Sequence, residues 1–282
     1  ALGELIKSIA DLTYWNPHPE IDSPSELMMI PEDWGLWYTL WEYHIDIAFP
    51  VSVMLLITVW FARQAGVATN ILGAEQRVQS NRSLISGIVA VFLSFHAVVI
   101  YLNISHLLVT AIAPGADPLA NVSLRFAGVG GAAALAIVFL NVSINGIFII
   151  ALFLINAARI FATFMLPVLV AYSAALRFAK VPLLTPQVTK ITKLLASAPL
   201  WTIPVAAGWR LMVILGGASP GSQTIGEYIV AEVGLSDIAG SGVAEQLFTS
   251  SLFMVPVLIG IIAPLKMTGA ASSLFYMSRL AG

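Results

Sequence analysis

The sequence contains no cysteine and few charged side chains. Without cysteine the chain forms no disulfide, no thiolate metal site and no iron–sulfur cluster, and it has no cysteine nucleophile. Only 10% of its 282 residues are charged and 59% are hydrophobic, whereas soluble domains carry about 25% charged residues. Several apolar runs exceed the roughly 18 residues that are typical of a spanning helix. These features exclude a soluble domain and predict an all-α, polytopic helical membrane protein.

Sequence motifs of enzymes are also lacking. The chain has no GxSxG, HExxH or Walker A motif, and no GxGxxG followed by an acidic ribose ligand, so we expect no enzyme activity. No acid lies within a predicted span apart from Asp46 at an edge, although coupled transporters ordinarily place carboxylates there. A secondary transporter is therefore only a third alternative. With four histidines in the whole chain, neither a haem nor another cofactor or metal is expected.

The charged side chains that are present are sorted by sign along the chain. Fourteen of the fifteen acids lie within 1–46, near Asp117 and within 227–245. Most bases lie in other intervals: Arg63, Arg77, Arg82, Arg159, Arg177, Lys180, Lys190 and Lys193. Because Lys and Arg are retained on the cytoplasmic side of a membrane, the acids are predicted outside and the bases inside. The sequence thus predicts a multi-pass protein of the plasma or inner membrane, with the N-terminus outside and the C-terminus cytoplasmic.

The apolar runs predict about five spans and one further helical element. The spans cover about 45–62, 84–112, 128–158, 194–216 and 249–273. Residues 160–178, bent at Pro167, are predicted to re-enter the membrane or to lie at its surface. The alternative is that residues 126–178 form two full spans, which would move the bases that follow to the acidic side. Residues 1–44 are then an external acidic, aromatic-rich segment, and residues 45–282 are the transmembrane domain.

The external segment contains an aromatic stripe at helical spacing, formed by Trp34, Trp37, Tyr38 and Trp41. Such a stripe suits an interfacial helix, because indole and phenol rings favour the head-group level. The alternative is the core of a small external domain. Upstream, the apolar spacing within residues 1–15 predicts a helix lying on the bilayer. Removal of a signal peptide would explain Ala1 and place the N-terminus outside, but loss of an initiator Met or a chosen boundary explains it equally well.

Polar side chains recur on one face of the third predicted span. Its members, which lie within about 60° of one another on a helix, are Asn141, Asn145, Asn156 and Arg159. In the second span, His96 and Asn103 lie seven residues apart on one side. Polar groups at bilayer depth face protein or water rather than lipid. These residues therefore either line a hydrated pathway or hydrogen-bond neighbouring helices.

A basic patch follows the third span, formed by Arg177, Lys180, Lys190 and Lys193. Anionic lipid head groups are the expected partner, at about 1 kcal/mol for each side chain near the surface. Nucleic acid or an acidic partner ATPase would use the same charges. The sequence leaves these partners open.

Several segments together resemble the VirB6/TrbL-like polytopic membrane subunits of type IV secretion and conjugation systems. They are Arg63…Glu75-Gln76-Arg77…Arg82, then Gly130-Gly131, then Ala158-Arg159-Ile160…Met165-Leu166-Pro167, followed by Pro182 and Pro186. The resemblance implies a channel or scaffold subunit that moves DNA or protein and assembles in several copies with other membrane or external subunits and a cytoplasmic ATPase. The polar residues of the second and third spans would then line the pathway.

A second function remains open, carried by the acidic, Trp-rich external segment. That segment would also suit a structural membrane protein of a virion, or the anchor of an external appendage.

Overall fold

The structure is a computed structural model in which every regular element among the described residues is helical. It describes residues 10–27, 30–69, 74–115, 132–181, 184–216, 224–232 and 254–264, with the backbone alone over 132–149. The longer helices are α2 (Leu36–Tyr43), α3 (Phe49–Ala68), α4 (Ala74–Ile112), α6 (Ala132–Ala179), α7 (Thr185–Ser197), α8 (Thr202–Leu215) and α9 (Ile225–Glu232). The short turns are η1 (Pro24–Leu27), η2 (Glu32–Trp34), the π-helix η3 (His44–Ala48) and η4 (Ala198–Trp201). Residues 10–14 and Met254–Pro264 are also helical.

Among the described residues, four helical segments are long and apolar enough to cross a membrane: Leu36–Ala68, Glu75–Ile112, Ile150–Ala179 and Thr185–Leu215. The first joins α2, η3 and α3, and the last joins α7, η4 and α8. With 30 to 38 residues each, they exceed the roughly 20 residues that a bilayer requires. The predicted class, a polytopic helical membrane protein, is confirmed. Of the predicted span 249–273, only the helix Met254–Pro264 lies within the described residues.

One helix, α6, replaces two elements that the sequence analysis separated. The predicted span 128–158 and the predicted bent element 160–178 belong in the structure to one continuous helix with Pro167 inside it. The backbone therefore does not separate the two elements, and the re-entrant or surface location of residues 160–178 stays a prediction. Proline removes one N–H donor and crowds the preceding turn, but every other backbone group of an apolar segment still needs a partner, and an unbroken helix provides one.

The chain forms two compact units, each built from separate stretches of sequence. Unit 1 comprises Ala1–Asn16, His106–Arg159 and Leu200–Gly282, and unit 2 comprises Pro17–Ser105 and Ile160–Pro199. Helices α4 and α6 each contribute residues to both units. The boundaries between the units therefore fall inside these two helices. Neither the hydrophobic runs nor the loop signals of the sequence mark such boundaries.

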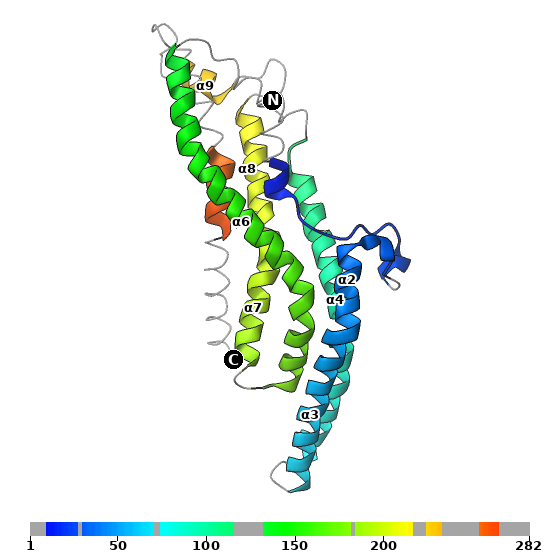
Figure 1. Cartoon of the computed structure of the whole chain (residues 1–282). Helices are drawn as coiled ribbons and strands as arrows, with labels where there is room; N and C mark the ends of the chain where they lie inside the picture. Colours follow the sequence, from blue (N-terminus) through cyan, green and yellow to red (C-terminus); the bar gives the residue numbers. More distant parts are fainter. Residues whose placement is uncertain are drawn as a thin grey trace. The chain divides into compact units, whose positions relative to one another are not determined.

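Unit 2 packs α3, α4 and the second half of α6 through small residues. In its largest cluster, Leu56 of α3 and Val91 of α4 lie with Ala171 and Ala175 of α6. Figure 1 shows α2 and α3 in line, with α4 alongside them. A Cβ added to Gly87 would lie 3.0 Å from Leu56 Cδ1 and 3.1 Å from the Phe178 Cβ. Small side chains thus allow the close helix approach that membrane helices use.

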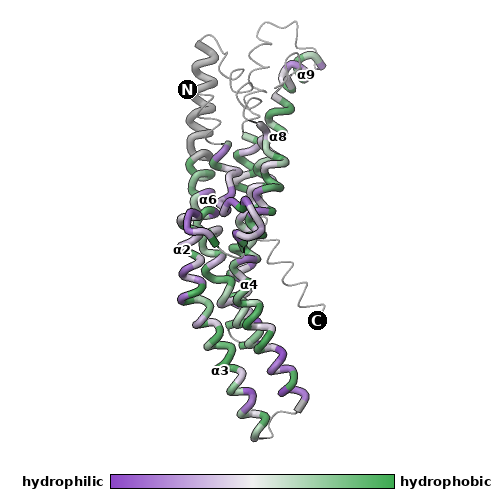
Figure 2. The backbone as a smooth tube through the Cα atoms, turned by 90° about the vertical axis from the view of Figure 1, so that its right-hand side faces the viewer, coloured by the Kyte–Doolittle hydropathy of each residue, from purple (hydrophilic) through white to green (hydrophobic). Residues whose placement is uncertain are grey.

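The outer faces of these helices remain apolar. Large hydrophobic side chains of α3 and α4 are exposed, among them Met54 (67%), Phe61 (61%) and Ile85 (66%). Figure 2 shows apolar residues along the length of α3. A surface of this kind is costly in water and favourable in lipid. The apolar residues that do not build the core therefore face the bilayer.

Unit 1 has its own core on α8. Val205, Trp209, Met212 and Val213 are buried there together with Ala10 of the N-terminal segment. Trp209 is fully buried. The core therefore joins the start of the chain to a helix about two hundred residues later.

Candidate functional site

The most deeply buried charged side chain of the described residues is Arg159, on α6. It is 1% exposed and lies within the candidate span Ile150–Ala179. A guanidinium is always ionised in proteins, and a charge at the bilayer centre costs at least about 2.5–3.5 kcal/mol. Such a residue is stable only where hydrogen-bond acceptors replace the lost water.

Oxygen atoms from two parts of unit 1 surround this guanidinium. The hydrogen bonds run from Nε to Asn156 Oδ1 (3.2 Å), from Nη1 to Asn16 Oδ1 (2.9 Å), and from Nη2 to the carbonyl oxygens of Trp15 (2.7 Å) and Leu12 (3.4 Å). Asn156 lies one helical turn before Arg159, so its amide and the guanidinium share a face of α6. The other three acceptors belong to the N-terminal segment. The planar fork of arginine allows this many acceptors to be reached at once.

The local structure of the N-terminal segment explains why its carbonyl groups are available. Residues 10–14 are helical and the helix then stops, with the amide of Trp15 bonded to the carbonyl of Asp11 at 2.8 Å. The last carbonyl groups of a helix have no partner within it, and they form the negative end of the helix dipole. Leu12 and Trp15 present such carbonyl groups, so the end of this helix is a natural site for a cation.

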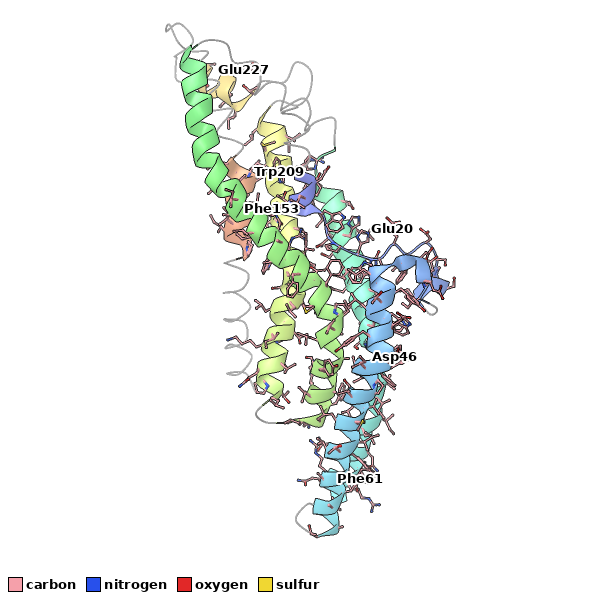
Figure 3. The ribbon with its side chains drawn as sticks, viewed as in Figure 1. Glu20, Asp46, Phe61, Phe153, Trp209 and Glu227 are labelled. Atoms are coloured by element: carbon pink, nitrogen blue, oxygen red, sulfur yellow. The ribbon has the colours of Figure 1, made fainter. Side chains whose placement is uncertain are left out.

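A second set of hydrogen bonds fixes the same segment to α8. Trp209 Nε1 donates to Thr13 Oγ1 at 2.8 Å, and Thr13 Oγ1 donates to the carbonyl of Ala10 at 2.8 Å. Asn16 Nδ2 donates to Thr202 Oγ1 at 3.4 Å. Figure 3 labels Trp209 on α8, beside the helical residues 10–14. We call these residues the Arg159 cluster: Leu12, Thr13, Trp15, Asn16, Asn156, Arg159, Thr202 and Trp209.

Next to the cluster, Tyr14 packs against the α8 core. Its hydroxyl donates to Asp11 Oδ1 at 2.8 Å. Burial, together with this hydrogen bond to the carboxylate, raises the pKa of Tyr14. The phenol therefore stays neutral at physiological pH and acts as a hydrogen-bond donor. Its role is to hold the N-terminal segment, not to carry charge.

The structure brings together two of the four polar residues predicted on the third span. Asn156 and Arg159 are in contact, whereas the side chains of Asn141 and Asn145 lie outside the described residues. Asn156 is 4% exposed, and its Nδ2 has no hydrogen-bond partner among the residues that the structure describes. The polar face of α6 thus contains one buried donor that the described part of the chain leaves without an acceptor.

The polar pair predicted on the second span lies in unit 2 and contacts residues nearer the N-terminus. Asn103 Nδ2 donates to the carbonyl oxygens of Pro19 and Val99, both at 3.0 Å. His96 packs its ring against Trp41, with the ring centroids 5.1 Å apart. Both side chains therefore help to hold the segment after residue 16 against α4.

The aromatic stripe also packs within unit 2. Trp37 is 7% exposed and lies 5.1 Å from Phe164 between ring centroids. Trp41 lies 5.2 Å from Phe95. Trp34 and Tyr38 pack around the cluster formed by Ile30, Phe95 and Val99. The stripe thus packs on α4 and α6, and both the head-group location of these four residues and the alternative of a small external domain stay predictions.

The family of the chain follows from a comparison of its whole length. The family model described as TrbL/VirB6 plasmid conjugal transfer like protein matches residues 1–265, which is nearly all of the 282 residues. The chain belongs to this family. The sequence resemblance is thereby confirmed, and the protein is a multi-pass membrane component of a conjugal transfer or type IV secretion system. Comparisons with curated proteins and with solved structures gave no significant match.

In this TrbL/VirB6 family member the basic patch flanks the connection between α6 and α7. Arg177 is exposed in the last turn of α6, and Lys190 and Lys193 are exposed on α7. Lys180 follows the end of α6 with a φ of 51°, the left-handed conformation in which many helices end. Among the described residues no group of three His, Asp or Glu side chains is placed to hold a metal ion.

Sequence reasoning missed the members of the cluster that lie outside α6. Thr13, Asn16, Thr202 and Trp209 carry no motif and have no periodic relation to Arg159. The usable signal was the buried charge itself: an arginine inside an apolar run requires acceptors from elsewhere in the chain. That requirement predicts that acceptors exist, but not which residues supply them.

Proposed function

We propose that this TrbL/VirB6 family member is a channel-forming scaffold subunit of a conjugal transfer or type IV secretion machine, and that DNA or protein passes along the polar face of α6. The observation that carries the proposal is the Arg159 cluster. A charged side chain and an amide lie inside an apolar span, and the cover over them is a short N-terminal segment held by hydrogen bonds. Polar groups at this depth face protein or water, so removing the cover would produce a hydrated surface.

The polar face of α6 suits a pathway that opens and closes. In the closed arrangement the N-terminal segment supplies acceptors to Arg159 from Asn16, Trp15 and Leu12. In the open arrangement water or the phosphate groups of DNA would supply them, and Asn156 Nδ2 would gain an acceptor. Asn141 and Asn145 would continue the same face. A hydrogen bond to a charged group contributes about 1.5–3 kcal/mol, so partner subunits can supply the energy for the exchange.

The remaining surfaces suit an assembled subunit. The exposed apolar faces of α3 and α4 contact lipid or further copies of the chain. Residues 1–44 and the other acidic stretches face outside and contact external subunits, and the C-terminus is cytoplasmic. The basic patch of Arg177, Lys180, Lys190 and Lys193 faces the cytoplasm, where anionic head groups or a transfer ATPase lie. Family membership favours this function over a virion protein or a secondary transporter.

A reversible cross-link tests whether the N-terminal segment must move. Asn16 Nδ2 and Thr202 Oγ1 are 3.4 Å apart, and the chain has no other cysteine, so the double variant Asn16→Cys/Thr202→Cys gives a unique pair. We expect conjugal transfer to fall when the pair is joined by a short thiol cross-linker with a reducible bond and to recover after reduction. Each single-cysteine variant, treated identically, is the matched control.

Full transfer with a completely cross-linked pair would show that the segment is a fixed anchor and would overturn the opening step. The pathway residues are tested separately by Asn145→Leu and Arg159→Leu in variants that still assemble. We expect reduced transfer from both. Unchanged transfer would remove the substituted residue from the pathway.

A further inference from the structure

A small pocket opens on unit 2 where α3 ends and α4 begins. Its polar walls come from Trp60 and Arg63 of α3 and from Ser80 and Ser83 of α4, and the end of α6 closes it. The inner space is about 10 Å³, and the pocket widens to about 180 Å³ with its open mouth. The inner space holds one water-sized group, so it accommodates a single oxygen atom of a larger ligand whose remainder sits in the mouth.

The guanidinium of Arg63 is fixed in the wall of this pocket. Its Nη2 donates to the carbonyl of Ala179, in the last turn of α6, at 2.6 Å. That carbonyl is one of those that a helix end leaves without an intrahelical partner. A guanidinium has five N–H donors in a rigid fork, so this bond orients Arg63 and leaves donors for a second acceptor. The pocket therefore presents a positive charge that is already in place.

The hydroxyl of Ser80 on α4 also lines this pocket and is buried. Ser80 is 4% exposed, and its Oγ has no hydrogen-bond partner among the described residues. Leaving a buried hydroxyl unpaired costs roughly 1–3 kcal/mol. Ser83 lies one helical turn further along α4 and lines the same pocket. Two hydroxyl groups and a guanidinium around a space for one oxygen are the donors that a phosphate group requires.

The surface around the pocket carries both bases and apolar side chains. Arg77 and Arg82 are exposed on α4, and Arg177 is exposed near the end of α6, with one acid, Glu75, in the same region. Large apolar side chains are also exposed on α3 and α4, including Phe61 (61%) and Ile85 (66%). Figure 3 labels Phe61 on α3.

The indole of Trp60 lines the same pocket. Its Nε1 donates to Asn81 Oδ1 at 2.7 Å. Indole rings that present one polar edge and one apolar edge are typical of the head-group level of a bilayer. A pocket walled by such a ring suits a ligand of that level, where lipid phosphate groups are found.

We propose that this pocket binds the phosphate group of an anionic phospholipid. One phosphate oxygen enters the inner space and accepts hydrogen bonds from Ser80 and Arg63, while the acyl chains lie along the exposed apolar side chains of α3 and α4. Soluble phosphate offers the same oxygen atoms but uses none of the apolar surface. The lipid is therefore the better partner, and the site does not depend on the proposed conduit.

Lipid retention by the purified protein tests this site. We would measure bound phosphatidylglycerol and phosphatidylcholine by native mass spectrometry for the unmodified protein, Ser80→Ala and Arg63→Gln. We expect each substitution to reduce the affinity for phosphatidylglycerol roughly tenfold, the effect of losing one hydrogen bond to a charged group. Phosphatidylcholine has the same phosphate oxygens but a cationic choline, so it should bind the unmodified protein more weakly and lose affinity in the same direction. Arg210→Gln, which removes an exposed base of α8 far along the chain from the pocket and outside the basic patch, is the matched control and should retain the anionic lipid as the unmodified protein does.

The response of Ser80→Ala separates a lipid site from an empty pocket. If no ligand used the hydroxyl, its removal would raise the thermal midpoint in both lipids and would leave phosphatidylglycerol retention unchanged, which would overturn the proposal. We expect instead that the stabilisation by phosphatidylglycerol is lost. Inorganic phosphate provides the second arm. Stabilisation by phosphate alone, abolished by Ser80→Ala, would assign the site to a soluble phosphate and would refute the lipid.

Discussion

At the scale of single residues, the hydrogen bonds of Arg159 replace the water that a guanidinium loses on burial. Its acceptors include the backbone carbonyl groups of Leu12 and Trp15, at the end of the N-terminal helix, and the side-chain amides of Asn16 and Asn156. Backbone carbonyl groups in a helix end already carry partial negative charge. These dipoles therefore help to hold the cation at a position where a charge is costly to bury.

Replacing Arg159 should reveal how much unit 1 depends on this residue. Arg159→Leu leaves several buried acceptors unpaired, each at a cost of about 1–3 kcal/mol. We expect a lower thermal midpoint in detergent, measured by tryptophan fluorescence. Arg159→Lys should be intermediate, because an ammonium lacks the planar fork. Arg177→Leu, an exposed site on the same helix, is the control. A midpoint for Arg159→Leu equal to that of the control would contradict the prediction.

The hydrogen bond between Trp209 and Thr13 can be measured by itself. Trp209→Phe and Thr13→Val each remove one of its partners, and the double variant completes a cycle that isolates their coupling. Side-chain hydrogen bonds in membrane proteins average about 0.6 kcal/mol, so we expect a coupling free energy of that order. Unfolding equilibria in detergent give the four values. Strictly additive effects would show that the bond contributes nothing to the fold.

At the scale of elements, α6 shows how context decides whether a proline ends a helix. Sequence rules allow Pro167 either to break the helix or to sit inside it. Leu166 next to it is buried with Trp37 and Leu102, and Ala171 and Ala175 one and two turns later pack on α3 and α4. The helix continues because its packing partners lie on both sides of the proline.

Two glycines at the contacts of the helix Met254–Pro264 should differ in their tolerance of a methyl group. A Cβ at Gly208 would lie 3.1 Å from the Cα of Pro256, and a Cβ at Gly260 would lie 2.4 Å from Leu152 Cδ1. Backbone cannot move aside without shifting the helix, whereas the end of a leucine side chain can rotate.

We therefore expect Gly208→Ala to lower the thermal midpoint more than Gly260→Ala does. Overpacking of a core typically costs about 1–3 kcal/mol, so Gly208→Ala should lie in that range. The comparison is made by thermal unfolding in one detergent. The reverse order of the two midpoints would show that Leu152 is held more rigidly than the helix backbone near Pro256.

At the scale of the whole molecule, the separation of charges is the property that orients the chain in the membrane. Residues 1–46 contain nine acids and one base, Lys7. The intervals around Arg63–Arg82 and Arg177–Lys193 contain bases and the single acid Glu75. Because bases are retained on the cytoplasmic side, the proposed orientation has the N-terminal segment outside.

Cysteine labelling of intact cells measures this orientation, since the natural chain has no cysteine. Asp22 and Lys190 are both exposed. We expect a membrane-impermeant thiol reagent to label Asp22→Cys in intact cells, and to label Lys190→Cys only after the membrane is opened. Labelling of both variants in opened membranes is the control for reactivity. Labelling of Lys190→Cys alone in intact cells would reverse the topology.

Much of the architecture could be predicted because the membrane acts on local properties of the sequence. Apolar runs of sufficient length predict spanning helices whatever they pack against, and the charges between them predict the sides. The polar pair Asn156 and Arg159 could be found in the same way, because both break an apolar run. The continuity of α6 through Pro167 could not, because it depends on contacts of Leu166 and Ala171 with other helices.

The sequence by itself determined that this is a helical membrane protein of the TrbL/VirB6 family, and that Arg159 needs acceptors at membrane depth. Only the tertiary structure decided that those acceptors are Asn16 and the carbonyl groups of Leu12 and Trp15, up to 147 residues away along the chain. The physical reason is that the hydrophobic effect is non-directional, so the burial that it drives can be predicted from composition. A hydrogen bond depends on the positions of two particular atoms, which the packing of distant segments sets.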